Sequence, residues 1–150
     1  MRAHNLSQSK SISFSDKLIN GLFSGILAGA VMLAFLLLAG LAIGEDPLQT
    51  LTYFSVPGQT TTPIASAFLH LGISAVYGSL FGIIIHFLPA SLRSNRGKWI
   101  SGLAFGLLLY LLASGVLLPA TGSRLLEIPA AILAAAHALY GLFLGLRTNS

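Results

Sequence analysis

The sequence contains no cysteine and very little charge. Of its 150 residues, 8% are Asp, Glu, Lys or Arg and 55% are hydrophobic, whereas about a quarter of the residues of a soluble domain are charged. The absence of cysteine excludes disulfides, thiolate metal sites and cysteine nucleophiles. The scarcity of charge excludes an ordinary soluble domain and indicates a chain that lies in lipid.

Long apolar runs separate the few charged residues. A bilayer core of about 30 Å needs roughly 20 helical residues, and four stretches without charge are at least that long or close to it. Pro63 and Pro89 bracket the second stretch, and Pro119 stands near the end of the third. Because helices start readily at proline and stop before one, we expect transmembrane helices at about 18–44, 64–88, 99–118 and 128–146.

The four helices predict an all-α fold, a four-transmembrane-helix bundle in a single membrane domain over residues 18–146. A polar tail, 1–17, precedes the domain and a short tail, 147–150, follows it. Ser13 and Asp16 have the spacing of a capping box ahead of the first apolar run. Between the first two helices, the pair Asp46-Pro47 is typical of a helix start and predicts a short interfacial helix.

The distribution of charge predicts the orientation of the chain. Most basic residues lie before the first helix, between the second and third, or after the fourth, and the acidic residues gather in the other two loops with Arg124. Basic loops stay in the cytoplasm, so both termini are expected on the cytoplasmic side of an inner (plasma) membrane. The first apolar run is much longer than the core of a signal peptide and is expected to remain as an anchor. The basic residues on the expected cytoplasmic side are Arg2, Lys10, Lys17, Arg93, Arg96, Lys98 and Arg147.

The two halves of the sequence resemble each other. Residues 21–25 at the start of the first helix (GLFSG) match 102–106 in the third (GLAFG), and 75–82 in the second (AVYGSLFG) match 138–145 in the fourth (ALYGLFLG). Each unit holds two helices, so its copies would run in the same direction, as two tandem hairpins in a parallel duplication. Chance similarity between glycine-rich apolar helices is the alternative.

Glycines four residues apart occur in every predicted helix. Such stripes let helix backbones approach closely in lipid, where no hydrophobic effect drives helices together. In the predicted orientation they occupy the cytoplasmic halves, while the leucine-rich segments 36–38 and 107–112 fill the outer halves. The helices are therefore expected to separate towards the outer face and to admit a lipid tail, a quinone or a helix of a neighbouring subunit. The alternative is an ordinary bundle whose outer half is filled by leucine side chains. The stripe glycines are Gly21, Gly25, Gly29, Gly78, Gly82, Gly102, Gly106, Gly141 and Gly145.

Two histidines stand at similar depths in the outer halves of the second and fourth helices. His70 and His137 lie one helical turn apart when the helices are aligned on Tyr77 and Tyr140. A pair of imidazoles from two helices is the smallest set that holds a six-coordinate haem b. The alternatives are interhelical hydrogen bonds with Ser74, Tyr77 or Tyr140, and contact with a quinone or lipid headgroup.

Three aromatic residues flank the predicted helices. Tyr53 and Phe54 lie in the first outer loop, and Trp99 begins the third helix on the cytoplasmic side. Aromatic rings are enriched at the two membrane–water interfaces, so these residues are predicted to anchor the protein at the headgroup level.

The sequence offers no set of residues typical of catalysis. It has no paired carboxylates, no nucleophile beside a base and no phosphate-binding glycine loop followed by lysine. No metal site and no resident cofactor are expected, and the basic residues follow the topology rule without a nucleic-acid partner. Without intramembrane charges, a proton relay or a pump is also disfavoured. The chain is therefore not expected to be an enzyme.

The fourth helix carries a loose resemblance. Its segment 137–145, HALYGLFLG, resembles the closing helix of several bacterial four-helix inner-membrane proteins. The overall build is similar to small accessory subunits of bacterial respiratory or photosynthetic complexes, such as alternative complex III. The resemblance implies a subunit of an electron-transfer assembly.

Three functions are compatible with these features. The first is a non-catalytic subunit that packs against other membrane subunits in a hetero-oligomer and stabilises them, bordering a lipid or quinone site. The second is a small transporter or channel for a neutral solute, acting as a dimer. The third is a membrane protein that binds haem between two histidines or binds a quinone.

Overall fold

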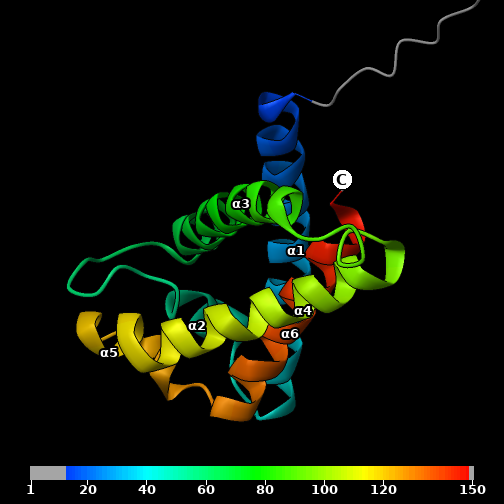
Figure 1. Ribbon diagram of the computed structural model, residues 1–150. Helices are drawn as coiled ribbons and strands as arrows, with labels where there is room; N and C mark the ends of the chain where they lie inside the picture. Colours follow the sequence, from blue (N-terminus) through cyan, green and yellow to red (C-terminus); the bar gives the residue numbers. More distant parts are fainter. Residues whose placement is uncertain (1–12, 149–150) are drawn as a thin grey trace, which may run out of the picture.

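The computed structural model describes residues 13–148, and within that range every regular element is helical. Four long apolar helices pack as a bundle (Figure 1). The protein is thus an all-α, multi-pass membrane protein with four candidate spans. The predicted tails lie mainly outside the described residues, at 1–12 and 149–150, whereas residues 14–17 belong to the first helix.

The helices have the following bounds along the chain. The four spans are α1 (Phe14–Ala42), α3 (Pro63–Phe87), the run from α4 (Asn95–Leu112) through the π-helical turn η1 (Ala113–Leu117) to α5 (Leu118–Thr121), and α6 (Ala130–Arg147). Two short elements lie between them: α2 (Pro47–Thr52) and the 3-10 turn η2 (Arg124–Glu127).

Capping serines explain why two spans start earlier than expected. The Ser13 hydroxyl accepts a hydrogen bond from the Asp16 amide at 3.1 Å, and the Asp16 carboxylate accepts one from the Ser13 amide at 3.0 Å. Ser94 likewise accepts from the Gly97 amide at 3.1 Å. Because these caps satisfy amides that a helix start leaves free, α1 and α4 each begin four residues before the apolar runs at 18 and 99.

The first loop folds as its sequence indicates. Asp46 caps α2 by accepting from the Leu48 amide at 2.8 Å, and Pro47 is the first helical residue. Thr62 caps α3 in the same way, with Pro63 following it. The structure therefore confirms the predicted short helix after Asp46 and the predicted helix start at proline.

The third span differs from its prediction at Pro119. The helix was expected to end before this proline, but it continues to Thr121 and ends at Gly122, whose φ is +65°. The π turn η1 precedes Pro119 and changes the hydrogen-bond register, which lets a residue without an amide hydrogen enter the helix. Ser114 donates to the Tyr110 carbonyl oxygen at 2.7 Å within this region.

The spans form two hairpins, one of α1 and α3 and one of α4 and α6. The hairpins meet mainly through α1 and α6, whereas the backbones of α3 and α4 touch little. Phe81 of α3 and Phe105 of α4 bridge that gap with ring centroids 5.2 Å apart. We call the end with the start of α1 and Arg147 the terminal end, and the end with α2 and η2 the loop end.

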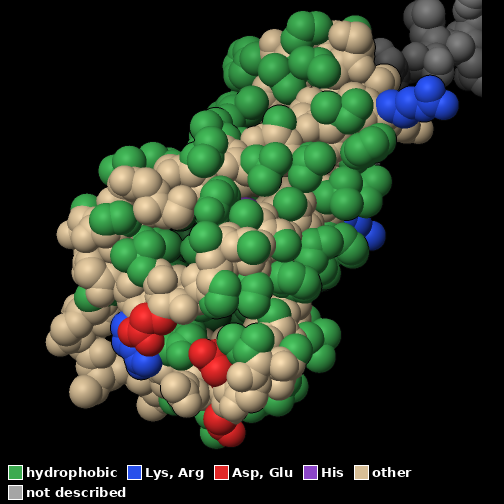
Figure 2. All heavy atoms as spheres, turned by 90° about the horizontal axis from the view of Figure 1, so that it is seen from below, with side chains coloured by type: hydrophobic (Ala, Val, Ile, Leu, Met, Phe, Trp, Pro, Cys, Tyr) green, Lys and Arg blue, Asp and Glu red, His purple; other side chains and the backbone are tan. Residues whose placement is uncertain are grey.

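Many large hydrophobic side chains are exposed on the surface, as expected for helices in lipid. In Figure 2 acidic side chains and one basic side chain gather in one part of the face seen from below, and other basic side chains lie at the opposite edge. The loop end carries Glu45, Asp46, Arg124 and Glu127. The charge separation read from the sequence is therefore present along the bundle.

Candidate functional site

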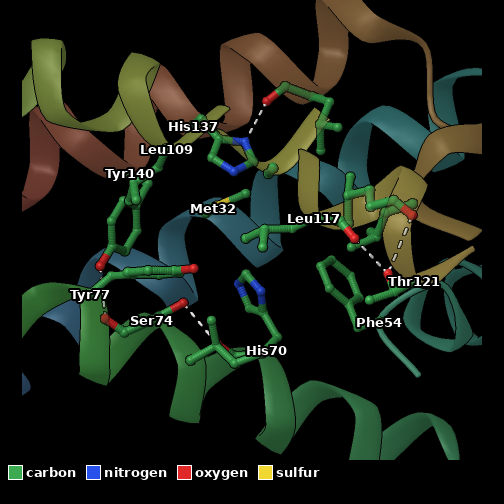
Figure 3. Close-up of a pocket in the computed structure, with 15 residues that line it drawn as sticks. Met32, Phe54, His70, Ser74, Tyr77, Leu109, Leu117, Thr121, His137 and Tyr140 are labelled. Atoms are coloured by element: carbon green, nitrogen blue, oxygen red, sulfur yellow. Dashed lines mark hydrogen bonds between the residues drawn. The ribbon is translucent and has the colours of Figure 1, made fainter. Parts of the chain in front are cut away.

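A cavity of about 240 Å³ lies between the two hairpins in the half of the bundle near the loop end. Side chains from α1, α3, α4, η1, α5 and α6 form its wall, and Phe54 and Leu125 close it towards the loop end. Figure 3 shows the residues that line it. Most of the wall is apolar, and the polar lining residues are His70, Ser74, Tyr77, Thr121, His137 and Tyr140.

The cavity opens on the side of the bundle between α3 and η1. Ile73 of α3 and Leu117 of η1 both line it, yet they are also 47% and 41% exposed. Since this flank of the molecule is apolar, the opening faces the hydrocarbon part of a bilayer. A molecule would enter from lipid and not from water.

His70 reaches into the cavity from α3 and is held by α1. Its Nε2 lies 3.1 Å from the carbonyl oxygen of Gly29, and its ring packs against Phe54 at 4.6 Å between centroids. The carbonyl oxygen can only accept, so Nε2 carries the hydrogen and Nδ1 is the unprotonated nitrogen of a neutral ring. The tautomer is therefore set by the helix opposite.

His137 reaches the same cavity from α6. Its Nδ1 lies 2.9 Å from the Leu133 carbonyl oxygen one turn earlier, so Nδ1 carries the hydrogen and Nε2 is unprotonated. The ring also packs edge-on against Tyr110 at 5.9 Å between centroids. In Figure 3 the rings of His70 and His137 point toward one another across the cavity. The structure thus brings both sequence-predicted histidines to one site.

The two tyrosines near this site play different parts. Tyr140 of α6 is buried and donates to the Ser74 carbonyl oxygen of α3 at 2.7 Å, which links the hairpins. Tyr77 of α3 lines the cavity, and its hydroxyl has no hydrogen-bond partner within residues 13–148. Ser74 donates to the His70 carbonyl oxygen at 2.8 Å within α3. Interhelical bonds therefore involve Tyr140 and His70, while Tyr77 is available to a ligand.

This geometry does not fit a haem bound between the two histidines through their Nε2 atoms. Nε2 of His70 is directed to the Gly29 carbonyl and bears its hydrogen. Within the described residues there is also no group of three or more His, Asp or Glu side chains that could hold a metal ion.

The glycine stripes lie where the helices of each hairpin cross. A Cβ placed on Gly21 would stand 2.5 Å from the carbonyl oxygen of Gly78, and one on Gly82 would stand 2.7 Å from that of Lys17. Such distances leave no room for a side chain. In the first hairpin Gly25 also faces Gly78, and Gly29 faces the Ser74 side chain. In the second hairpin Gly102 faces Gly141, and Gly145 faces Lys98. Gly106 faces both Gly141 and His137.

The prediction that Tyr53 and Phe54 anchor the protein in the headgroup layer is wrong. Their side chains are 3% and 7% exposed and point into the protein. Tyr53 donates to Glu45 at 3.0 Å and lies under the Arg124 guanidinium, 4.7 Å from the ring centroid. A loop that folds back over the cavity buries rings that a surface loop would expose. Trp99, in contrast, is 37% exposed near the terminal end.

A charged cluster covers the loop end above the cavity. Arg124 Nε donates to Glu127 at 3.0 Å, which lowers the pKa of the Glu127 carboxyl and raises the pKa of Arg124. Burial and the hydrogen bond with Glu45 raise the pKa of Tyr53. These contacts tie α2 to η2, and they hold Phe54 in place as the lid of the cavity.

Sequence reasoning missed the part of the wall that η1 and α5 supply. Ala113, Leu117, Leu118 and Thr121 line the cavity together with Met32 of α1. The π register that turns these side chains inward has no distinct sequence pattern.

Comparisons with known proteins add a family but no activity. Neither the curated proteins nor the solved structures contain a match to the chain. One family model matches residues 15–149, which is nearly the whole sequence. The chain therefore belongs to DUF6789, a family of unknown function.

Proposed function

We propose that this membrane protein binds one apolar molecule with a small polar head, taken from the bilayer, and does not transform it chemically. The observation that carries the proposal is the cavity between the hairpins, of about 240 Å³ and open between α3 and η1. Concave, mostly apolar sites with a few convergent polar groups are typical of small-molecule binding. A quinone or a lipid has the required chemistry.

The polar groups are arranged to orient such a molecule. Tyr77, His70 and His137 approach the cavity from two different hairpins, so a head bound between them contacts both. The lining ends at Tyr77 and Tyr140, one residue before Gly78 and Gly141, where the helix backbones come together. This arrangement supports a binding site closed towards the terminal end, and it disfavours the alternative of a pore through one chain.

Binding of nonylphenol to the protein in nanodiscs tests the proposal. Ala113→Trp would place an indole in the cavity, because Ala113 lines it. We expect this variant to bind nonylphenol at least tenfold more weakly than the wild type, by native mass spectrometry. Ala104→Trp is the matched control, since Ala104 is exposed on the same helix. Equal binding by wild type and Ala113→Trp, or no binding at all, would overturn the proposal.

The orientation and location predicted from charge are part of the proposal. The start of α1 and the end of α6 both lie in the upper part of Figure 1, opposite α2 and α5. With the positive-inside rule, this supports cytoplasmic termini and an outward-facing cavity half in a bacterial inner membrane. Cysteines introduced at Ser55 and at Asn95 should react with an impermeant maleimide from the outside and from the inside, respectively, because the native chain has none.

A second candidate is the packing subunit of a larger membrane assembly. The span from Asn95 to Thr121 is the least covered, with 17% of its most apolar window buried against 33% in each other span. That flank supports contact with helices of another subunit, and an electron-transfer complex stays a prediction from the sequence resemblance. Native electrophoresis after mild extraction checks it: co-migration with larger membrane proteins supports a subunit, and a free monomer or dimer contradicts it.

A further inference from the structure

Almost every hydrogen that the polar lining residues can donate is already committed to a backbone carbonyl. Nε2–H of His70 goes to Gly29, and Nδ1–H of His137 goes to Leu133. The hydroxyls of Ser74, Thr121 and Tyr140 donate to the carbonyls of His70, Leu117 and Ser74, respectively. The Tyr77 hydroxyl is the exception among the polar lining residues.

What remains free in the cavity is therefore mainly the capacity to accept hydrogen bonds. A neutral imidazole with one nitrogen donating has a lone pair on the other. For His70 this is Nδ1 and for His137 it is Nε2, and neither atom has a hydrogen-bond partner within residues 13–148. An occupant that covers these two nitrogens must donate hydrogen bonds to them, because a polar group that becomes buried without a partner is costly.

The occupant is also neutral. No Asp, Glu, Lys or Arg lines the cavity, so nothing balances a charged head. Charged groups are costly at membrane depth unless they are paired. Carboxylates, phosphates and ammonium groups are thus poor ligands here, which excludes fatty acids and ordinary phospholipid headgroups from the centre of the site.

We infer that the cavity selects a neutral molecule whose head carries hydroxyl groups, and that His70 and His137 accept the hydroxyl hydrogens. The inference rests on the proposed function and deepens it. A carbonyl or ether head offers only acceptors, and it could pair with Tyr77 alone. A hydroquinone would bind better than the corresponding quinone, and a monoacylglycerol better than a fully esterified lipid.

Matched ligands with and without hydroxyl hydrogens test this inference. Pentylresorcinol and its dimethyl ether share one apolar body, but the ether cannot donate. Each hydrogen bond lost changes affinity by roughly threefold to tenfold, so the diol should bind the wild type at least tenfold more tightly. Binding is measured in nanodiscs by native mass spectrometry and by the shift in unfolding temperature.

Histidine variants separate recognition of the hydrogens from the larger size of the ether. His137→Phe and His70→Phe keep an aromatic ring but remove the accepting nitrogens, and each should reduce the preference for the diol to a few fold. His86→Phe is the control, since His86 is exposed and does not line the cavity. If His70→Phe does not fold, His137→Phe still decides, because its partner carbonyl lies in its own helix.

The two natural sources of such a head are distinguished by a second pair of measurements. In the first measurement, decylhydroquinone (kept under argon) and decylquinone each compete with pentylresorcinol, and stronger competition by the hydroquinone indicates a reduced quinone. In the second, stronger competition by monoolein than by decylhydroquinone indicates a lipid alcohol. Either result supports the inference. Equal affinity for the diol and its ether, with Ala113→Trp still blocking both, overturns it and leaves the proposed function standing. No binding of any of these molecules overturns both.

Discussion

The two hairpins make the same contacts at the terminal end and different contacts near the loop end. Gly21 meets Gly78 in one as Gly102 meets Gly141 in the other, and Lys17 and Lys98 stand at equivalent places beside Gly82 and Gly145. About two turns beyond Gly21 along α1, Gly29 meets Ser74 in the first hairpin. The equivalent positions in the second hairpin hold Tyr110 and His137, whose rings pack against each other. The two hairpins thus share their close contacts near the terminal end and differ in their contacts nearer the loop end.

This difference explains where the cavity lies. Gly29 lets α1 and α3 stay close for another turn, and its carbonyl receives the His70 hydrogen. In the second hairpin the rings of Tyr110 and His137 occupy the equivalent space. Larger side chains at a crossing hold helices further apart, so the second hairpin opens towards the loop end. The position of the cavity thus follows from this difference between two similar hairpins.

The largest effect is expected when Gly29 of the first hairpin is replaced by tyrosine, the residue at the equivalent position of the second hairpin. A Cβ on Gly29 would already lie 2.5 Å from the Ser74 side chain, so Gly29→Tyr cannot fit without parting α1 and α3. We expect a loss of more than about 3 kcal/mol in the free energy of unfolding, measured by denaturation in mixed micelles. An unfolding midpoint equal to that of the wild type would show that the two hairpins tolerate the same residues.

The shared contacts should respond equally in both halves. Gly78→Ala and Gly141→Ala each place a methyl group against an opposing backbone, and each should cost about 1–3 kcal/mol. Gly72→Ala is the control in α3, because no atom lies within 4 Å of its added Cβ. Unfolding midpoints of the three variants measure the effect; a large cost in one hairpin alone would contradict the equivalence.

The equivalent tyrosines should respond unequally. Tyr140→Phe removes the hydrogen bond to the Ser74 carbonyl that links the hairpins, and it should cost about 1 kcal/mol. Tyr77→Phe removes a hydroxyl without a partner in the described residues, and the unfolding free energy should change little. Both are measured by the same denaturation experiment. Equal losses would mean that Tyr77 makes an interhelical bond of its own.

The helix caps offer a smaller test. Ser13→Ala and Ser94→Ala remove hydroxyls that accept from Asp16 and Gly97, and each should cost about 0.5–1 kcal/mol. Replacement by Asp at either position should restore most of the loss, since Asp is also a good cap. Helix content near each site can be followed by amide hydrogen exchange. Protection unchanged after Ser94→Ala would contradict a capping role in the second hairpin.

The smallest effect is expected at the exposed pair of Arg124 and Glu127. Pairing lowers the pKa of Glu127 below its ordinary 4.5, so the contribution of the pair is present at neutral pH and lost as the pH falls through that lowered pKa. Glu127→Gln should remove this part of the acid dependence and leave the rest. Thermal unfolding from pH 7 to pH 3 measures the difference, which salt should reduce.

The sequence predicted the membrane class, the four spans and their pairing well, because these depend on apolar length and on small residues spaced by one turn. The Ser13 cap and the Asp46-Pro47 start were also readable from local chemistry. The predicted exposure of Tyr53 and Phe54 at the membrane surface was wrong, because their burial depends on how a loop folds over the bundle. The sequence also placed the end of the third span too early, since a π turn is set by packing and not by pattern.

The close glycine contacts join helices that are neighbours in the chain. Each hairpin can therefore insert and pair as soon as its own two spans have been synthesised, because local contacts form fastest. The cavity has walls from both hairpins, and it exists once α6 docks on α1 and Tyr140 reaches α3. The cavity is thus completed in the last step of folding, and a molecule bound there, as proposed above, would stabilise the contact between two preformed hairpins.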